Sequence, residues 1–196
     1  SIIDDYLFKD LDLLKDILST EILKRLAALL AFQIGSVVSL NELSINLGID
    51  VKTVGRYITL LKQGFVIFEV PSFSKNPRKE LAKSKKYFFW DLGIRNALID
   101  QFLPLDSRTD VGQLWENFLA VERLKKNEYL LIQKEYFFWR SYEKAEIDWI
   151  ETEENKIIAF EFKWKAVKPH TPKAFREAYN EDVEIISKDN YLEFVI

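Results

Sequence analysis

Residues 148–165 read Asp148-Trp-Ile-Glu-Thr-Glu-Glu-Asn-Lys-Ile-Ile-Ala-Phe-Glu161-Phe-Lys163-Trp-Lys165, two strand-like runs around a polar turn. In the second run, aromatic residues alternate with charged ones. Side chains two apart in a strand share a face, so Glu161 and Lys163 are expected to point the same way. A hairpin with its turn at residues 151–156 would bring Asp148 beside them.

This grouping has two interpretations. Two carboxylates and an ammonium are what a magnesium-dependent phosphodiester hydrolase needs, because acids hold the metal and a lysine lies near the attacking water or the phosphate. We therefore predict Asp148 and Glu161 as metal ligands and catalytic residues, with Lys163 as a third catalytic residue. In the alternative, alternating Glu and Lys form a solvated strand face with cross-strand ion pairs.

Composition narrows the class of protein. With 196 residues, 48% hydrophobic and 30% charged, the chain is typical of one or two soluble globular domains. The absence of cysteine excludes disulfides and thiolate metal sites, and the single His170 excludes a multi-histidine zinc site. No apolar run is long enough to span a membrane, and no signal peptide is seen, so we predict a cytoplasmic protein without a membrane partner. The sequence contains no methionine, so we expect a fragment of a longer protein.

The net charge of −3 is unevenly distributed. Residues 36–91 contain 9 basic and 5 acidic side chains, which is a local net charge of +4. This basic segment is therefore the expected contact with nucleic acid.

The same segment has the pattern of a winged helix. Ser39 and Glu42 form a capping box at the start of a helix over residues 40–47, a turn follows at 48–50, and a second helix covers 51–63. Strands at 65–70 and 85–90 complete the motif. Winged helices either bind DNA or mediate protein contacts, and both remain open. The predicted DNA-binding residues lie on the second helix and the wing: Lys52, Thr53, Arg56, Lys75, Arg78, Lys79, Lys83, Lys85 and Lys86.

A polar segment after residue 103 predicts a domain boundary, with domains at 1–104 and 105–196. The second domain begins with an amphipathic helix over 112–126 that carries Glu116. No Gly-rich phosphate loop is present. Other helices are predicted at 5–18, 20–34 and 172–179, and residues 91–103 are predicted as a short helix that leads into an irregular segment. Strands are predicted at 129–133, 136–139, 146–150, 157–164, 183–187 and 192–196.

The order helix–strands–helix–strand, with an acid on the first helix, resembles the PD-(D/E)XK or restriction-endonuclease-like fold. The expected fold class is therefore α+β, an N-terminal helical and winged-helix domain followed by a restriction-endonuclease-like α/β domain with a mixed sheet. By this resemblance Asp148 and Glu161 bind Mg²⁺ or Mn²⁺, Glu116 completes the metal site, and Lys163 assists the hydrolytic water.

A closer resemblance covers nearly the whole chain. Its motifs include Leu43-Ser-x-x-Leu-Gly, Asn76-Pro-Arg-Lys, Lys83-Ser-Lys-Lys-Tyr-Phe-Phe-Trp-Asp-Leu-Gly93, Gly112-x-Leu-Trp-Glu-Asn-Phe and Glu146-Ile-Asp. In this order they resemble the C-terminal region of a family of prokaryotic AAA-type ATPases. Lys85-Lys86 stands where that family has a proline-lysine pair. The resemblance implies an N-terminal ATP-binding module outside this chain as a partner, together with DNA. Whether the protein forms a homo-oligomer stays open.

Three functions are compatible with these patterns. The first is a metal-dependent DNA nuclease. The second is a catalytically inactive nuclease-like fold that binds DNA or a protein, in which Arg140 pairs with Glu146 or Glu161 and Lys163 pairs with Asp148. The third is a winged-helix regulator, which would keep sequence-specific DNA binding after loss of the predicted metal-site residues.

Overall fold

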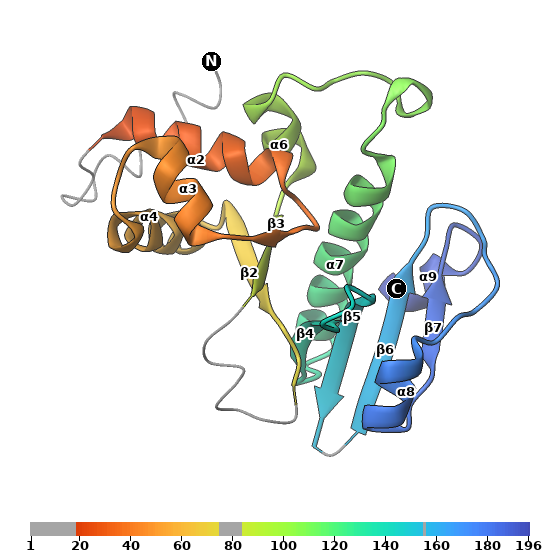
Figure 1. Cartoon of the computed structure of the whole chain (residues 1–196). Helices are drawn as coiled ribbons and strands as arrows, with labels where there is room; N and C mark the ends of the chain where they lie inside the picture. The colour runs from red at the N-terminus through yellow and green to blue at the C-terminus, as the bar shows by residue number, and fades with distance from the viewer. Residues whose placement is uncertain (1–18, 75–83, 155) are drawn as a thin grey trace. The chain divides into compact units, whose positions relative to one another are not determined.

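The computed structural model describes residues 19–74, 84–154 and 156–196. The fold is α+β, with two sheets of which one is mixed (Figure 1). The chain divides into two compact units, residues 1–69 with 87–107 and residues 70–86 with 108–196. The division at 107/108 lies near the expected boundary at residue 104, but residues 70–86 group with the second unit. In the described part of the chain no helix combines the length and apolar character needed to cross a membrane.

The first unit is mainly helical. Its helices are α2 (Thr20–Phe32), α3 (Leu40–Leu47), α4 (Val51–Gln63) and α6 (Leu92–Leu98). The three-stranded sheet has the order β1-β3-β2, formed by β1 (Val37–Val38), β2 (Ile67–Pro71) and β3 (Lys85–Phe89). The helix expected at residues 5–18 lies outside the described residues.

Local capping explains why α3 and α4 begin where the sequence predicts. The Ser39 hydroxyl accepts a hydrogen bond from the Glu42 amide, and the Asp50 carboxylate accepts one from the Thr53 amide at 2.9 Å. Gly48 ends α3 at φ +67°, a left-handed conformation that favours glycine. Both helices are confirmed with the expected bounds.

Ser19 links the start of α2 to α4. Its hydroxyl caps α2 by accepting a hydrogen bond from the Ile22 amide. Its own amide donates to the hydroxyl of Tyr57, which is buried on α4, at 3.0 Å. A tyrosine can lie in a core when its polar tip finds a partner.

The second unit is built on a four-stranded sheet in the order β4-β5-β6-β7. Antiparallel pairs join β4 to β5 and β5 to β6, whereas β6 and β7 are parallel. The crossover between the parallel strands contains α8 (Figure 1). The elements are α7 (Val111–Tyr129), β4 (Glu135–Arg140), β5 (Glu146–Glu153), β6 (Lys156–Phe162), α8 (Lys173–Tyr179), β7 (Val183–Ile186) and α9 (Tyr191–Val195).

The side chains of β6 point alternately to the two faces of this sheet, and each face packs against other elements. Phe160 and Phe162 contact Phe194 of α9, with ring centroids 4.9 and 5.5 Å apart. On the other face Ala159 belongs to an apolar cluster with Phe175 of α8. The sheet therefore lies between α7 with α9 on one face and α8 on the other.

Two predicted strands are wrong. At 129–133, α7 continues to Tyr129 and the chain then turns, with the Ile132 amide donating to the Asn127 carbonyl at 2.8 Å. At 192–196 the chain forms helix α9. Both runs are rich in β-prone residues, but no neighbouring strand pairs with them within the described residues, and β-propensity depends on such a neighbour.

Candidate functional site

A register shift between β4 and β5 determines the position of Asp148. Phe137 lies opposite Ile150, but Trp139 lies opposite Ile147, so the single residue between them on β4 faces both Asp148 and Trp149 on β5. Such a β-bulge redirects a side chain locally, and bulges are over-represented next to active sites.

The hairpin brings Asp148 to the strand that carries Glu161. Oδ2 of Asp148 accepts a hydrogen bond from the Phe162 amide at 2.8 Å, and Nζ of Lys163 lies 2.5 Å from Oε1 of Glu161. Burial, together with the charge of Asp148, raises the pKa of Glu161. The expected grouping of Asp148, Glu161 and Lys163 therefore exists in the structure.

Glu116 reaches the same group from α7. Burial raises the pKa of Glu116 to about 8, and although the Lys86 ammonium opposes this shift, the charges of Asp148 and Glu146 add to it. Burial likewise raises the pKa of Asp148. Both carboxyls lie in a region with little water and excess negative charge.

Lys86 requires a correction. It was expected on an exposed wing as a DNA contact, but its side chain has no exposed surface, and Nζ lies 2.6 Å from Glu146 Oε1, 2.9 Å from Glu116 Oε1 and 4.0 Å from Asp148 Oδ1. Burial alone would lower the pKa of Lys86, but the charges of these three acids raise it above its ordinary value. An ammonium remains buried only when it is paired in this way.

The sequence carried a signal for this burial. Lys86 directly precedes the aromatic run Tyr87-Phe88-Phe89. Strand alternation puts Lys86 on the same face as the fully buried Phe88. A lysine in register with core residues indicates a paired, buried cation.

We call the resulting group the acid–lysine cluster: Lys86, Glu116, Glu146, Asp148, Glu161 and Lys163. Four carboxylates face two ammonium groups, so the cluster carries a net charge of −2 when all are ionised. The oxygen donors suit Mg²⁺ or Mn²⁺ in kind and in charge. In their present positions, however, no three Asp, Glu or His side chains among the described residues form a group able to hold a metal ion.

The other predicted DNA contacts have different placements. Lys52 and Arg56 are exposed on α4. Thr53 is half-buried, and its hydroxyl donates to the Asp50 carboxylate at 2.6 Å, so it serves the helix cap. Lys85 is half-buried on β3. Lys75, Arg78, Lys79 and Lys83 lie outside the described residues.

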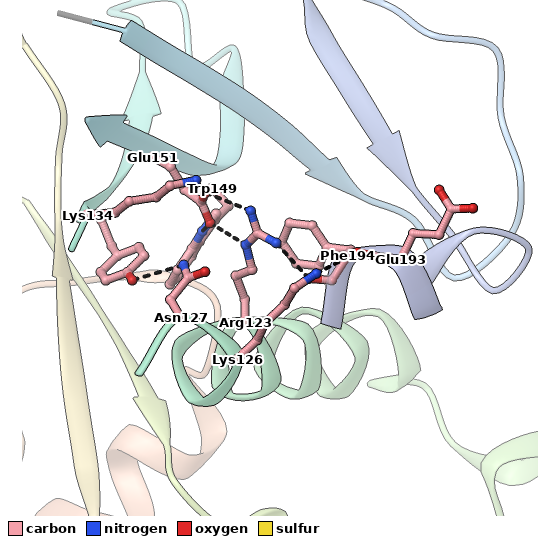
Figure 2. Close-up of polar contacts among 9 residues, drawn as sticks. Arg123, Lys126, Asn127, Lys134, Trp149, Glu151, Glu193 and Phe194 are labelled. Atoms are coloured by element: carbon pink, nitrogen blue, oxygen red, sulfur yellow. Dashed lines mark hydrogen bonds and ion pairs between the residues drawn. The ribbon is translucent and has the colours of Figure 1, made fainter. Parts of the chain in front are cut away.

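A second ionic network surrounds Glu151. The sequence did not predict it, because Glu151 was expected in the exposed turn. It is instead buried in β5 (Figure 2). Its carboxylate accepts bidentate hydrogen bonds from Arg123 at 2.6 and 2.9 Å and one from Lys134 at 2.7 Å, and the Trp149 indole donates at 3.2 Å. Burial would raise the pKa of Glu151, but the hydrogen bonds from Arg123 and Lys134 lower it.

This network joins the elements that carry the acid–lysine cluster. Arg123 and Glu116 both lie on α7, and Glu151 and Asp148 both lie on β5. Arg123 also donates to the Phe194 carbonyl of α9 at 2.8 Å. The position of the helix on the sheet, and thus that of Glu116 relative to Asp148, depends on these bonds.

Comparison with known proteins places the chain among uncharacterised families. Residues 1–106, more than half of the chain, match the domain of unknown function DUF8612. The chain belongs to this family. Residues 111–192 match a second domain of unknown function, DUF4143, and this match covers most of the unit that contains the acid–lysine cluster.

Two curated relatives match the DUF8612 chain over most of its length. They are the uncharacterized protein Rv2008c of Mycobacterium tuberculosis and the uncharacterized protein Mb2031c of Mycobacterium bovis, each 26% identical over 178 residues. The match covers 90% of this chain and 39% of each relative, so the chain spans about two fifths of their length. No solved structure matches the chain significantly.

Proposed function

We propose that the second unit is a restriction-endonuclease-like domain whose acid–lysine cluster hydrolyses phosphodiester bonds in DNA. One observation carries this proposal: Glu116, Asp148 and Glu161 converge from α7, β5 and β6, with Lys163 bonded to Glu161. Carboxylates flanked by a lysine are the residue set that this hydrolysis needs.

In this proposal Glu116, Asp148 and Glu161 hold Mg²⁺ or Mn²⁺. The cation would polarise the phosphate and supply an activated water. The side chain of Lys163 is 41% exposed, so its ammonium can meet an incoming phosphate while Glu161 orients it. The buried Lys86 holds Glu116 and Glu146 in place and limits the repulsion between the acids.

The experiment is a nicking assay on supercoiled DNA with Mn²⁺. The variants are Asp148→Asn and Glu161→Gln, with Glu153→Gln as the control because Glu153 is exposed on the same hairpin. We expect the site variants to lose at least about 100-fold in rate, a loss comparable to removal of one preorganised electrostatic group. An unchanged rate in Asp148→Asn contradicts the assignment.

A second candidate is a nuclease-like fold that binds without catalysis. One observation favours it: the Lys86 ammonium already lies between the carboxylates of Glu116 and Glu146. The Arg140–Glu146 contact expected for this alternative is present at 3.7 Å, whereas Lys163 pairs with Glu161 and not with Asp148. Titration calorimetry distinguishes the two, because the enzyme predicts saturable Mn²⁺ binding that Asp148→Asn weakens, and the binding module predicts none.

We further propose that the helices of the first unit belong to a winged helix that contacts duplex DNA. The tight turn between α3 and α4 and the exposed Lys52 and Arg56 on α4 support this role. In the full-length protein the chain would act beside an AAA-type ATPase module, which fits its span of about two fifths of its relatives. A winged-helix regulator would keep sequence-specific DNA binding in the Asp148→Asn, Glu161→Gln double variant.

A further inference from the structure

The second unit contains a pocket of about 440 Å³, and one of its lining residues, Arg140, contacts Glu146 of the acid–lysine cluster. Three parts of the second unit form its walls. They are residues 72–74 after β2 together with Ser84 before β3, the end of β4 with the turn that follows it, and α8. Its walls combine aromatic rings, serine hydroxyls and one arginine, among them Phe73, Trp139, Arg140, Ser141, Tyr142 and Tyr179. The volume is in the range of pockets that bind small organic ligands.

The aromatic walls are fixed by their own packing. Phe73 contacts Phe137 and Tyr179, each with ring centroids 5.2 Å apart, and Trp139 meets Phe175 edge to face. The Phe73 amide donates to the Phe138 carbonyl at 2.6 Å, which anchors this wall to β4. The rings therefore form a rigid floor and side.

Tyr142 stands on the rim with 95% of its surface exposed. It lies in a turn closed by hydrogen bonds between Ser141 and Ala145, at 2.8 and 3.1 Å. Because the turn is held at both ends, the ring is presented to solvent on a defined backbone. An exposed aromatic ring beside other rings offers a flat ligand a stacking surface.

Arg140 links this pocket to the cluster. Among the described lining residues it carries the only formal charge. Its Nε lies 3.7 Å from Glu146 Oε2, beyond an ordinary hydrogen bond, and the other oxygen of Glu146 lies 2.6 Å from Lys86. Because Arg140 meets Glu146 only through this long contact, the guanidinium can turn its donors to a phosphate.

We propose that this pocket binds one nucleotide of a single-stranded nucleic acid that crosses the acid–lysine cluster, an inference that rests on the proposed nuclease function. The base stacks on Tyr142 and meets the serine hydroxyls, and the phosphate meets Arg140. Bases in a duplex are paired and stacked, so duplex DNA cannot fill the pocket without unpairing. The ligand chemistry is that of a nucleotide, from a strand or free in solution.

The test measures the binding of a fluorescein-labelled 12-nucleotide single strand by anisotropy, with EDTA present. We expect Tyr142→Ala to weaken binding about tenfold, the usual effect of losing one stacking partner. Arg140→Gln should weaken binding and lower the slope of log affinity against log salt by about 0.7, the contribution of one phosphate contact on a single strand. The controls are Tyr129→Ala, 84% exposed in the same unit, and Arg176→Gln on α8.

The outcomes separate clearly. The proposal that the pocket binds a nucleotide is overturned if Tyr142→Ala and Tyr129→Ala lose equal affinity for the strand, or if the wild-type protein does not bind the strand. A duplex whose binding Tyr142→Ala weakens as much as that of the 12-mer, or free deoxyadenosine monophosphate that binds as tightly as the 12-mer, overturns the single-strand assignment. EDTA removes divalent cations, so the measurement is independent of cleavage. Absence of Mn²⁺-dependent nicking then counts against the nuclease and not against the pocket.

Discussion

The Nζ atom of Lys86 lies 2.9 Å from Oε1 of Glu116, and the lysine side chain has no exposed surface. This ion pair connects the start of β3 to the first half of α7, between residues 30 positions apart in sequence. It places a positive charge inside a group of carboxylates whose pKa values are raised by burial. The energetics of the proposed site therefore depend on Lys86.

Lys86→Met should destabilise the protein at pH 9 by about 3–5 kcal/mol, because Glu116, whose pKa is raised to about 8, is then ionised and loses its cation in a region with little water. The loss should be smaller at pH 6, where Glu116 is protonated. Urea unfolding at both pH values measures the difference. Lys173→Met is the control, since the Lys173 side chain is 88% exposed, and an equal effect in the two variants would contradict the prediction.

Glu116→Gln should flatten the dependence of stability on pH between about 4.5 and 8. The pKa of Glu116 rises from 4.5 to about 8 on folding, so the native state binds more protons than the unfolded state in this window. Its contribution is therefore fully present below pH 4.5 and is lost as the pH rises through 8. Unfolding free energies at half-unit pH steps measure this, and parallel curves for wild type and variant would refute it.

Glu151→Gln should cost about 3–5 kcal/mol at pH 7, because Arg123 and Lys134 would keep buried charges without a carboxylate. The pKa of Glu151 is lowered on folding, so its contribution is present above the unfolded value near 4.5 and is lost as the pH falls through the native value. Urea denaturation followed by tryptophan fluorescence reports the change. Glu153→Gln, exposed at the end of the same strand, should stay within about 0.5 kcal/mol of wild type.

Lys52→Gln and Arg56→Gln should each weaken duplex DNA binding about equally for all sequences and lower the salt slope of log affinity by about 0.9, if each contacts one phosphate. Binding isotherms from 50 to about 300 mM salt measure the slope. Lys62→Gln is the matched control, because Lys62 lies in the last turn of the same helix and pairs with Glu69 at 2.8 Å. The same slope change in this control would argue against a specific α4 contact.

Sequence alone determined the parts of this protein that depend on neighbouring residues. The capping box of Ser39 and Glu42 and the turn at residues 48–50 predicted α3 and α4, because such signals span only a few positions. The alternation around Glu161 predicted strand β6, and the hairpin predicted its approach to Asp148. Strand alternation is a local property and can be read directly.

Only the tertiary structure decided which charges are buried. Lys86 and Glu151 looked like surface residues in a wing and a turn, but their environments come from α7 and β5, and from residues up to 62 positions away. The secondary structure of residues 129–133 and 192–196 likewise depended on whether a strand lay beside them. A charge is stable in a core only when distant partners arrive to neutralise it, and the order of residues along a chain does not state which partners fold together.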